Sequence, residues 1–411
     1  MSHLKTADAS LLPIFLLSAA GFTVLTTEFI IVGLLPSMAR DLHVTVSKAG
    51  LLVTIFALTV AAVGPILTAR VVGFERKKLF LFTLLLFALS NGLASFAPNI
   101  VVMAVARLLP ALMLPVFWSL ASETAVQITG PEHAGKAISM VSFGVVGATI
   151  FGIPIGALIA YQFGWRSAFA ILGVLALAKA LLLLFFLPRL PGAKDRLPVL
   201  QQLGILRQPR ILGHIFLSLL VFAGIFTAYT YLADILEKLA GFSGSTVGWI
   251  LMGFGGVGLI GNWAGGRMVD RHALGASILF CTPLAIGLCM LVPFMKWRAM
   301  LAFVLVVWGF CQAALITVSH TRVMKATAGM PALGASLNIS GANLGIALGA
   351  FIGSCAIDVA GLQSVGLAAA VIIIAAIAAA AIFLGGRAVP GVSLMKYLPF
   401  KAMNTSQLRS L

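Results

Sequence analysis

Long apolar runs recur along the whole chain and are separated by short segments of charged or turn-forming residues. Each run holds about 20 residues, which as a helix is long enough to cross the hydrocarbon core of a bilayer. Barrel strands would instead alternate polar and apolar positions over about 10 residues. The pattern therefore predicts twelve transmembrane helices, near residues 11–35, 48–69, 79–97, 100–126, 135–160, 167–187, 211–232, 247–266, 274–294, 299–320, 331–356 and 362–385.

The two halves of the chain resemble each other. TARVVGFERKK follows the second run and GGRMVDRH follows the eighth, while the fifth and eleventh runs both repeat glycine every few residues. The longest polar connection, rich in proline and arginine, lies between the sixth and seventh runs. We expect an all-α membrane protein with six-helix bundles at 1–188 and 211–385, a cytoplasmic linker at 189–210 and a cytoplasmic tail at 386–411.

Basic residues fix the expected orientation. With a cytoplasmic N-terminus, 19 of the 27 lysines and arginines fall in cytoplasmic segments and 6 in the opposite ones, which favours both termini inside. Membrane topology also explains the net charge of +16 better than nucleic-acid binding, because the charges sit in short clusters between apolar runs. The first run continues past a small-residue stretch that resembles a signal-peptide cleavage site, which favours an uncleaved first span.

Composition narrows the possible chemistry. Hydrophobic residues make up 61% of the 411-residue chain, and the sequence contains no phosphate-binding loop and no cluster with metal-ligand spacing. The four cysteines fall in predicted spans and are expected to be small core residues. We expect no enzymatic activity, cofactor or metal, although a membrane enzyme or a scaffold without transport stays a competing hypothesis.

Two ionisable residues lie deep in predicted spans. Glu28 in TTEF and Arg107 in the fourth run both fall in the outer half of the bilayer, at depths that long side chains can bridge. Movement of Arg107 relative to Glu28 would change the proton affinity of the carboxylate, which is what proton coupling requires. The competing interpretation is a static buried ion pair that orients helices. Glu123 and His214 lie nearer the span ends and are expected to be interfacial.

Polar and aromatic residues near the midplane suggest a solute site. Asn343 offers hydrogen bonds, and Phe117 with Trp118 offers flat apolar surface. Tyr229 and Tyr231, near the outer end of the seventh run, form either an external gate or part of the interfacial aromatic belt.

Glycines and a proline punctuate the fifth run at Gly147, Gly152, Pro154 and Gly156. Glycine at this spacing permits close helix packing, and the proline removes a backbone hydrogen bond and permits a bend. The run is predicted either to pack tightly within its bundle or to form a seam between the halves that limits leak.

Taken together, these residues resemble the major facilitator superfamily. Gly266, Arg267, Asp270 and Arg271 are similar to its signature loop, whereas the first-half copy around Arg70 lacks the usual aspartate. The glycines and proline of the fifth run match a motif of its drug:proton antiporter branch. TTEF, FGWR, TAYTYL and the asparagine in SLNISGANLGIALGA resemble the bacterial sugar efflux transporters.

The resemblance implies a monomeric transporter of the bacterial inner membrane with the major facilitator fold. It implies a proton-coupled antiporter that exports small polar solutes, sugars or glycosides first, by alternating access. The alternatives are a multidrug or nucleoside exporter of the same branch, and a facilitator or symporter that imports a solute. The partners are a small-molecule substrate, protons and the lipid bilayer.

Overall fold

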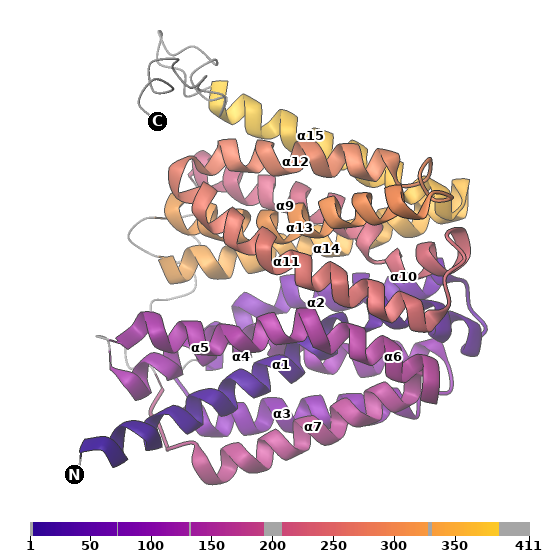
Figure 1. Ribbon diagram of the computed structural model, residues 1–411. Helices are drawn as coiled ribbons and strands as arrows, with labels where there is room; N and C mark the ends of the chain where they lie inside the picture. Colours follow the sequence, from indigo (N-terminus) through magenta and orange to yellow (C-terminus); the bar gives the residue numbers. More distant parts are fainter. Residues whose placement is uncertain (1–2, 72, 131–132, 193–207, 328–330, 386–411) are drawn as a thin grey trace, which may run out of the picture.

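The computed structural model describes residues 3–71, 73–130, 133–192, 208–327 and 331–385. In this part of the chain, twelve helical segments are long and apolar enough to span a membrane, which confirms the predicted all-α fold. They form two groups, α1 to α7 and α9 to α15 (Figure 1). The predicted linker falls largely on residues 193–207 and the tail on 386–411, which lie outside the described residues.

The first group begins with α1, which reaches Asp41 rather than the predicted end near residue 35. The fifth span consists of two α-helices joined by one π-helical turn, η2, directly before Pro154, where the missing backbone donor permits the irregular turn. The elements of this group are α1 (His3–Asp41), α2 (Val46–Val71), α3 (Arg76–Ser95), α4 (Ile100–Thr129), α5 (Ala134–Gly147), η2 (Ala148–Gly152), α6 (Ile153–Phe163) and α7 (Trp165–Phe186).

The second group repeats this order. Its first span, α9, is extended by two short helical turns, α10 and η4, and its last, α15, is preceded by a 3-10 turn, η5. The elements are α9 (Pro209–Tyr229), α10 (Leu232–Asp234), η4 (Ile235–Leu239), α11 (Gly244–Arg271), α12 (Ala273–Met290), α13 (Arg298–Ala326), α14 (Pro331–Ala360), η5 (Leu362–Ser364) and α15 (Val365–Gly385).

Local signals place several helix ends. Asn99 caps α4, its Oδ1 accepting hydrogen bonds from the amides of Val101 (3.1 Å) and Val102 (3.0 Å). Ser243 caps α11 in the same way, with the Thr246 amide as donor at 3.3 Å. Gly164 ends α6 with φ of 84°, a backbone conformation that side chains with a Cβ rarely adopt.

Equivalent glycines hold the equivalent helix pairs together in the two groups. A Cβ on Gly144 of α5 would lie 2.0 Å from the carbonyl oxygen of Ser18 in α1, and one on Gly345 of α14 would lie 2.5 Å from that of Leu219 in α9. Gly345 lies 201 residues beyond Gly144, and Leu219 lies 201 beyond Ser18. The similar glycine spacing of the fifth and eleventh runs therefore reflects a structural repeat, with the same close backbone contact in both halves.

We call the face where α1 begins and α15 ends the terminal face and the other the opposite face (Figure 1). Between the two groups, every hydrogen bond of the described residues lies near the opposite face. Ser47 of α2 bonds Ser354 (2.9 Å) and Asp358 (2.8 Å) of α14, and Arg40 pairs with Glu237 (2.8 Å). Toward the terminal face the groups diverge (Figure 1).

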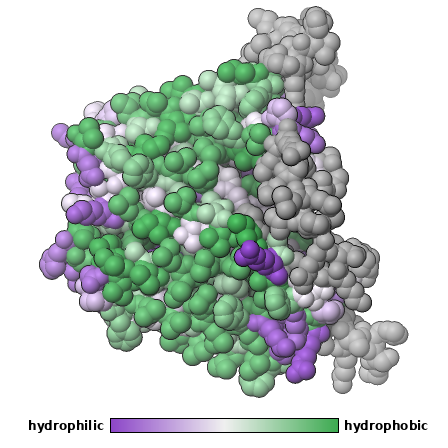
Figure 2. All heavy atoms as spheres, turned by 180° about the vertical axis from the view of Figure 1, so that it is seen from behind, coloured by the Kyte–Doolittle hydropathy of each residue, from purple (hydrophilic) through white to green (hydrophobic). Residues whose placement is uncertain are grey.

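A broad apolar surface covers the face of the bundle seen in Figure 2, with polar residues toward its two ends. Large side chains point outward along the helices, among them Phe82, Phe185 and Ile382, which are 57%, 75% and 70% exposed. In water such a surface would be unfavourable, whereas lipid chains satisfy it at no cost. The outer surface thus matches the bilayer that the sequence predicts.

Candidate functional site

Glu28 and Arg107 lie side by side in the first group. Arg107, 2% exposed, donates to the backbone carbonyl of Glu28 at 2.6 Å and to that of Thr27, and its Cζ lies 4.4 Å from the ring centroid of Phe56. None of the ion pairs within 4.0 Å among the described residues joins its guanidinium to the Glu28 carboxylate. The two residues meet as predicted, but Arg107 is anchored on the backbone beside Glu28 instead of on its side chain.

Residues of both groups surround Glu28. A small cavity is lined by Glu28, Phe56 and Arg107 of the first group and by Ile346 of α14 in the second. Glu28 is 8% exposed and lines this space, whose wall depends on how the halves are placed. A rearrangement of the halves would change the hydration of the carboxylate, and hydration controls its proton affinity.

A second cavity, of about 160 Å³, lies between the two groups. Thr149 of η2 lines it from the first group, and Tyr229, Asn262 and Gln312 line it from the second. Gln312 accepts a hydrogen bond from Trp308 Nε1 at 2.9 Å through its amide oxygen. We call this space the interhalf cavity. It combines hydrogen-bonding groups with apolar walls, which is the composition typical of a site for a small polar solute.

Two of the predicted solute-binding residues do not face this cavity. Phe117 is fully buried in the core of the first group, where its ring lies 5.6 Å from that of Phe80 and 5.3 Å from that of Trp118. A Cβ on Gly21 of α1 would lie 3.1 Å from the Trp118 ring, which shows how closely α1 covers it. Phe117 and Trp118 therefore do not line the interhalf cavity, because their rings pack against neighbouring helices of the first group, and their part in solute binding stays a prediction.

The tyrosines of the seventh span are buried, so the interfacial-belt interpretation is wrong. Tyr231 is fully buried and donates to the carbonyl of Ala350 at 2.8 Å, while a Cβ on Gly50 of α2 would lie 2.2 Å from its hydroxyl. It therefore packs between the two groups at the opposite face. Tyr229 lines the interhalf cavity and stacks on Phe254 at 5.7 Å.

Asn343 lies in α14 and is 6% exposed. Its amide nitrogen donates to the Ile339 carbonyl at 3.0 Å, and its Oδ1 has no hydrogen-bond partner among the described residues. An amide oxygen without a partner in the membrane is an acceptor available to a ligand, so Asn343 stays a candidate.

The comparisons with known proteins agree with this architecture. The sequence profile of the Major Facilitator Superfamily matches residues 17–327 and 216–394. An uncharacterized MFS-type transporter, YtbD of Bacillus subtilis (strain 168), is 32% identical over 366 residues, which cover 87% of this chain and 92% of YtbD. The chain belongs to the Major Facilitator Superfamily. Its members are alternating-access transporters rather than enzymes.

Solved structures share the superfamily fold at low sequence identity. A bacterial homologue of the human lysosomal transporter Spinster, inward-facing and unoccupied, has a TM-score of 0.73 at 16% identity, covering 94% of this chain and 99% of that one. A mutant of the nucleoside transporter NupG has a TM-score of 0.73 at 15% identity, covering 92% and 100%. At these identities the likeness shows the fold alone.

The motif of the fifth span packs within one half of this superfamily member. A Cβ on Gly147, Gly152 or Gly156 would meet Phe22, Thr26 or Ile30 of α1 at 3.3, 2.1 and 2.5 Å. The predicted seam between the halves is therefore wrong for these glycines, and packing within the bundle is the correct interpretation. The seam is formed on another face of the span, where Gly248 and Gly255 of α11 approach Leu158 and Thr149.

The signature loop of the second half also makes its contacts within that half. Asp270 pairs with Lys325 of α13 at 2.7 Å, Arg267 lies over the ring of Trp263 at 5.0 Å, and Arg271 is exposed at the end of α11. A Cβ on Gly266 would have open space, so its small size is not required by packing here. In the first half, Arg70 is exposed at the corresponding end of α2.

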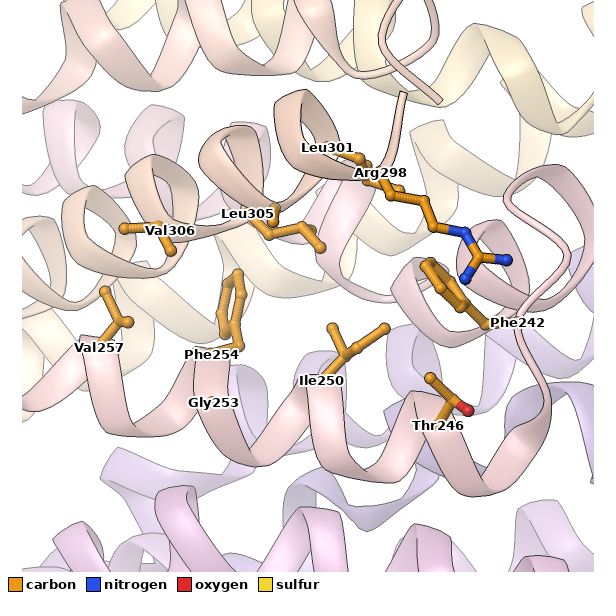
Figure 3. A pocket seen from close by; sticks show the side chains of 11 residues that line it. Phe242, Thr246, Ile250, Gly253, Phe254, Val257, Arg298, Leu301, Leu305 and Val306 are labelled. Atoms are coloured by element: carbon orange, nitrogen blue, oxygen red, sulfur yellow. The ribbon is translucent and has the colours of Figure 1, made fainter. Parts of the chain in front are cut away.

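An apolar groove of about 350 Å³, larger than the interhalf cavity, lies between α11 and α13 (Figure 3). Ile250, Phe254 and Leu305 line its length, and Arg298 lies at one end with its Cζ 5.6 Å from the Phe242 ring. Only the second group lines it, and it offers few hydrogen-bonding groups. It is therefore a poorer site for a polar solute than the interhalf cavity, despite its volume.

Sequence analysis missed Thr149, Asn262 and Gln312 as cavity residues. Gln312 stands in the apolar stretch FCQAAL, and the criterion that selected Asn343, an uncharged polar side chain within a span, also selects Gln312. The side of the helix on which it faces could not be predicted, because α13 is apolar around most of its circumference.

Proposed function

We propose that this transporter is a proton-coupled antiporter that exports small polar solutes, with sugars or glycosides as the first candidates. The observation that carries the proposal is the position of Glu28. Glu28 places a carboxylate within the membrane span α1, and Arg107 donates a hydrogen bond to the backbone carbonyl of Glu28. Both residues line a cavity whose wall includes Ile346 of the other half.

Alternating access would couple that carboxylate to the solute. When the halves part around Glu28, water reaches the carboxylate, and when they close, apolar groups such as Ile346 replace the water. The proton would thus load on one side of the membrane and leave on the other. The interhalf cavity is smaller than the roughly 300 to 1,000 Å³ of typical ligand sites, so solute entry also requires the halves to part.

The proposed orientation places the terminal face in the cytoplasm of a bacterium and the protein, as a monomer, in the inner membrane. The excess of lysine and arginine in the segments at that face supports this orientation. With the halves joined near the opposite face, the arrangement described here would then be open toward the cytoplasm. The two bundles, joined by a cytoplasmic linker at 189–210, would rock against each other as two units.

Solute counterflow in proteoliposomes with an imposed pH gradient tests the proposal. A panel of labelled sugars, nucleosides and cationic drugs identifies a transported solute first. Antiport predicts that internal acid stimulates uptake of that solute and that a protonophore abolishes the stimulation. Stimulation by external acid would show a symporter instead, and a rate independent of the gradient would show a facilitator.

An aromatic pair at the interhalf cavity favours the nucleoside alternative. The chain shares its fold with the nucleoside transporter NupG, and the stacked rings of Tyr229 and Phe254 at the interhalf cavity offer an aromatic surface on which a nucleobase could stack. Competition between a labelled sugar and unlabelled nucleosides in the same counterflow assay separates the two classes of solute.

A further inference from the structure

A pocket of about 250 Å³ lies at the terminal face of the second half, away from the interhalf cavity. Six of its lining residues carry basic side chains, namely Arg210, His214, Arg271, His272, Arg322 and Lys325. We propose that this basic pocket binds an anion that carries a phosphate group. The proposal does not depend on the transported solute or on proton coupling.

The deepest cation of the basic pocket is Arg322, which is 1% exposed. Its Nη1 lies 3.2 Å from Nδ1 of His214 and its Nη2 donates to Ser218 at 3.0 Å, while its Nε has no hydrogen-bond partner among the described residues. No carboxylate of the described residues pairs with this guanidinium within 4.0 Å. Burying a charge without a counterion is costly, and a bound anion would provide one.

Helix ends add to the positive potential. The pocket is lined by Ala273 and Leu274, the first two residues of α12, and by Arg210 in the first turn of α9. The amides of a helix's first turn point outward without partners in the helix, and together with the helix dipole they favour an anion. The Gly275 amide of α12 is already capped by Nδ1 of His272 at 3.3 Å, so the groups that converge on this space are the first residues of α12, the first turn of α9 and the buried arginine.

The described residues supply little negative charge to this pocket. Asp270, at the end of α11, already accepts a hydrogen bond from Lys325 at 2.7 Å, and Lys325 also donates to the Val269 carbonyl at 3.2 Å. Among the residues that line the pocket there is no aspartate or glutamate. The basic lining of the pocket therefore suits an anion that binds from outside the chain.

A phosphate group suits the pocket better than a carboxylate or chloride. Its several oxygens can accept from guanidinium groups and helix amides at once, and arginine binds it in a bidentate geometry. A lipid headgroup at the membrane surface and a free phosphate compound from the water would both present this group. Arg322 lies ten residues beyond Gln312 on α13, about 15 Å along the helix, so the pocket is separate from the interhalf cavity.

The test measures thermal unfolding of the purified full-length protein in detergent, with inorganic phosphate or pyrophosphate in one arm and short-chain phosphatidylglycerol in the other. Binding predicts a saturable rise in the unfolding temperature in at least one arm, beyond that given by potassium chloride at equal ionic strength. A response to phosphate or pyrophosphate identifies a free anion, and a response to the lipid alone identifies a headgroup. Equal shifts with chloride, or none, would overturn the proposal.

Substitutions of exposed arginines test the site in the same unfolding assay. Arg210→Gln and Arg271→Gln each remove one charge at the rim and should weaken the apparent affinity about tenfold, the value of one charge-assisted hydrogen bond. Arg189→Gln is the matched control, because it removes an exposed arginine at the terminal face of the other half, and it should leave the affinity unchanged. Equal weakening in all three variants would show charge screening instead of a site.

Discussion

Helices α1 and α9 hold equivalent places in the two halves, yet they carry different chemistry at the same point. The 201-residue shift that relates their glycine contacts places TTEF of α1 over TAYT of α9, so Tyr229 stands where the first half has Glu28. Glu28 lies beside Arg107, whereas Tyr229 stacks on Phe254 at 5.7 Å and packs edge-on against Phe226 at 5.6 Å. The repeat thus determines the position of the side chain, whereas the residue type at that position differs between the halves: an ionisable carboxylate in the first and an aromatic ring in the second.

The two halves also differ at the terminal face, in the partner of a buried arginine. In the first half, the fully buried Arg76 pairs with Glu123 of α4 at 2.6 Å. In the second, Arg322 lies at a similar depth of α13, 24 residues after its start compared with 23 for Glu123, and contacts His214 and Ser218 instead of a carboxylate. Among the described residues at this end, the buried arginine of the first half has a carboxylate partner and the buried arginine of the second half has none.

The largest expected effect is on gradient-driven flux, and it should be much greater for a substitution of Glu28 than for one of Tyr229. Glu28→Gln should reduce gradient-driven flux about 100-fold or more, because the amide cannot carry the proton, while exchange without a gradient continues. Tyr229→Phe removes only a hydroxyl from the interhalf cavity and should change the flux by about threefold. Both rates are measured in proteoliposomes with and without a pH gradient. A Glu28→Gln variant with the pH dependence of the unmodified protein would remove Glu28 from the mechanism.

A smaller effect tests whether the repeat packs alike in both halves. Gly144→Ala and Gly345→Ala push a methyl group against a backbone carbonyl, at 2.0 and 2.5 Å, and should lower the free energy of unfolding by roughly 1 to 3 kcal/mol or more, with Gly144→Ala the worse. Gly92→Ala is the control, since a Cβ there meets nothing within 4 Å and should stabilise α3 by up to about 1 kcal/mol.

Thermal unfolding of the three glycine variants in detergent gives the comparison. If Gly144→Ala and Gly92→Ala unfold at the same temperature, the close contact between α1 and α5 does not hold the first half together. If only Gly345→Ala is tolerated, the two halves are packed less alike than the 201-residue shift indicates.

The smallest effect concerns the contacts that join the halves. Ser47→Ala removes side-chain hydrogen bonds to Ser354 and Asp358 and should shift the balance between the two access states by about tenfold. Arg40→Gln removes only a largely exposed ion pair with Glu237 and should shift it by about threefold or less. Spin-label distances between cysteines placed at 48 and 359 in a cysteine-free background report the populations. A larger shift for Arg40→Gln would contradict this ranking.

Much of the fold follows from the sequence because its signals are local. Each span is defined by a continuous apolar run, and the glycines of the fifth and eleventh spans repeat at the same spacing. The site was predicted less completely. Glu28 and Arg107 stand out in the sequence because a charge in a span is rare, whereas the packing of Phe117 and Trp118 could not be predicted, because apolar rings are as common in a core as in a cavity.

The sequence by itself determined the twelve helices, the repeat and the position of Glu28 and Arg107 within spans, since each depends on composition within a segment or on spacing along it. Only the tertiary structure decided that Arg107 is anchored on the backbone of Glu28, that Ile346 closes the same cavity, and that Arg322 has no carboxylate partner among the described residues. Those contacts join residues many turns apart. They depend on helix rotation, which a helix apolar around most of its circumference does not reveal.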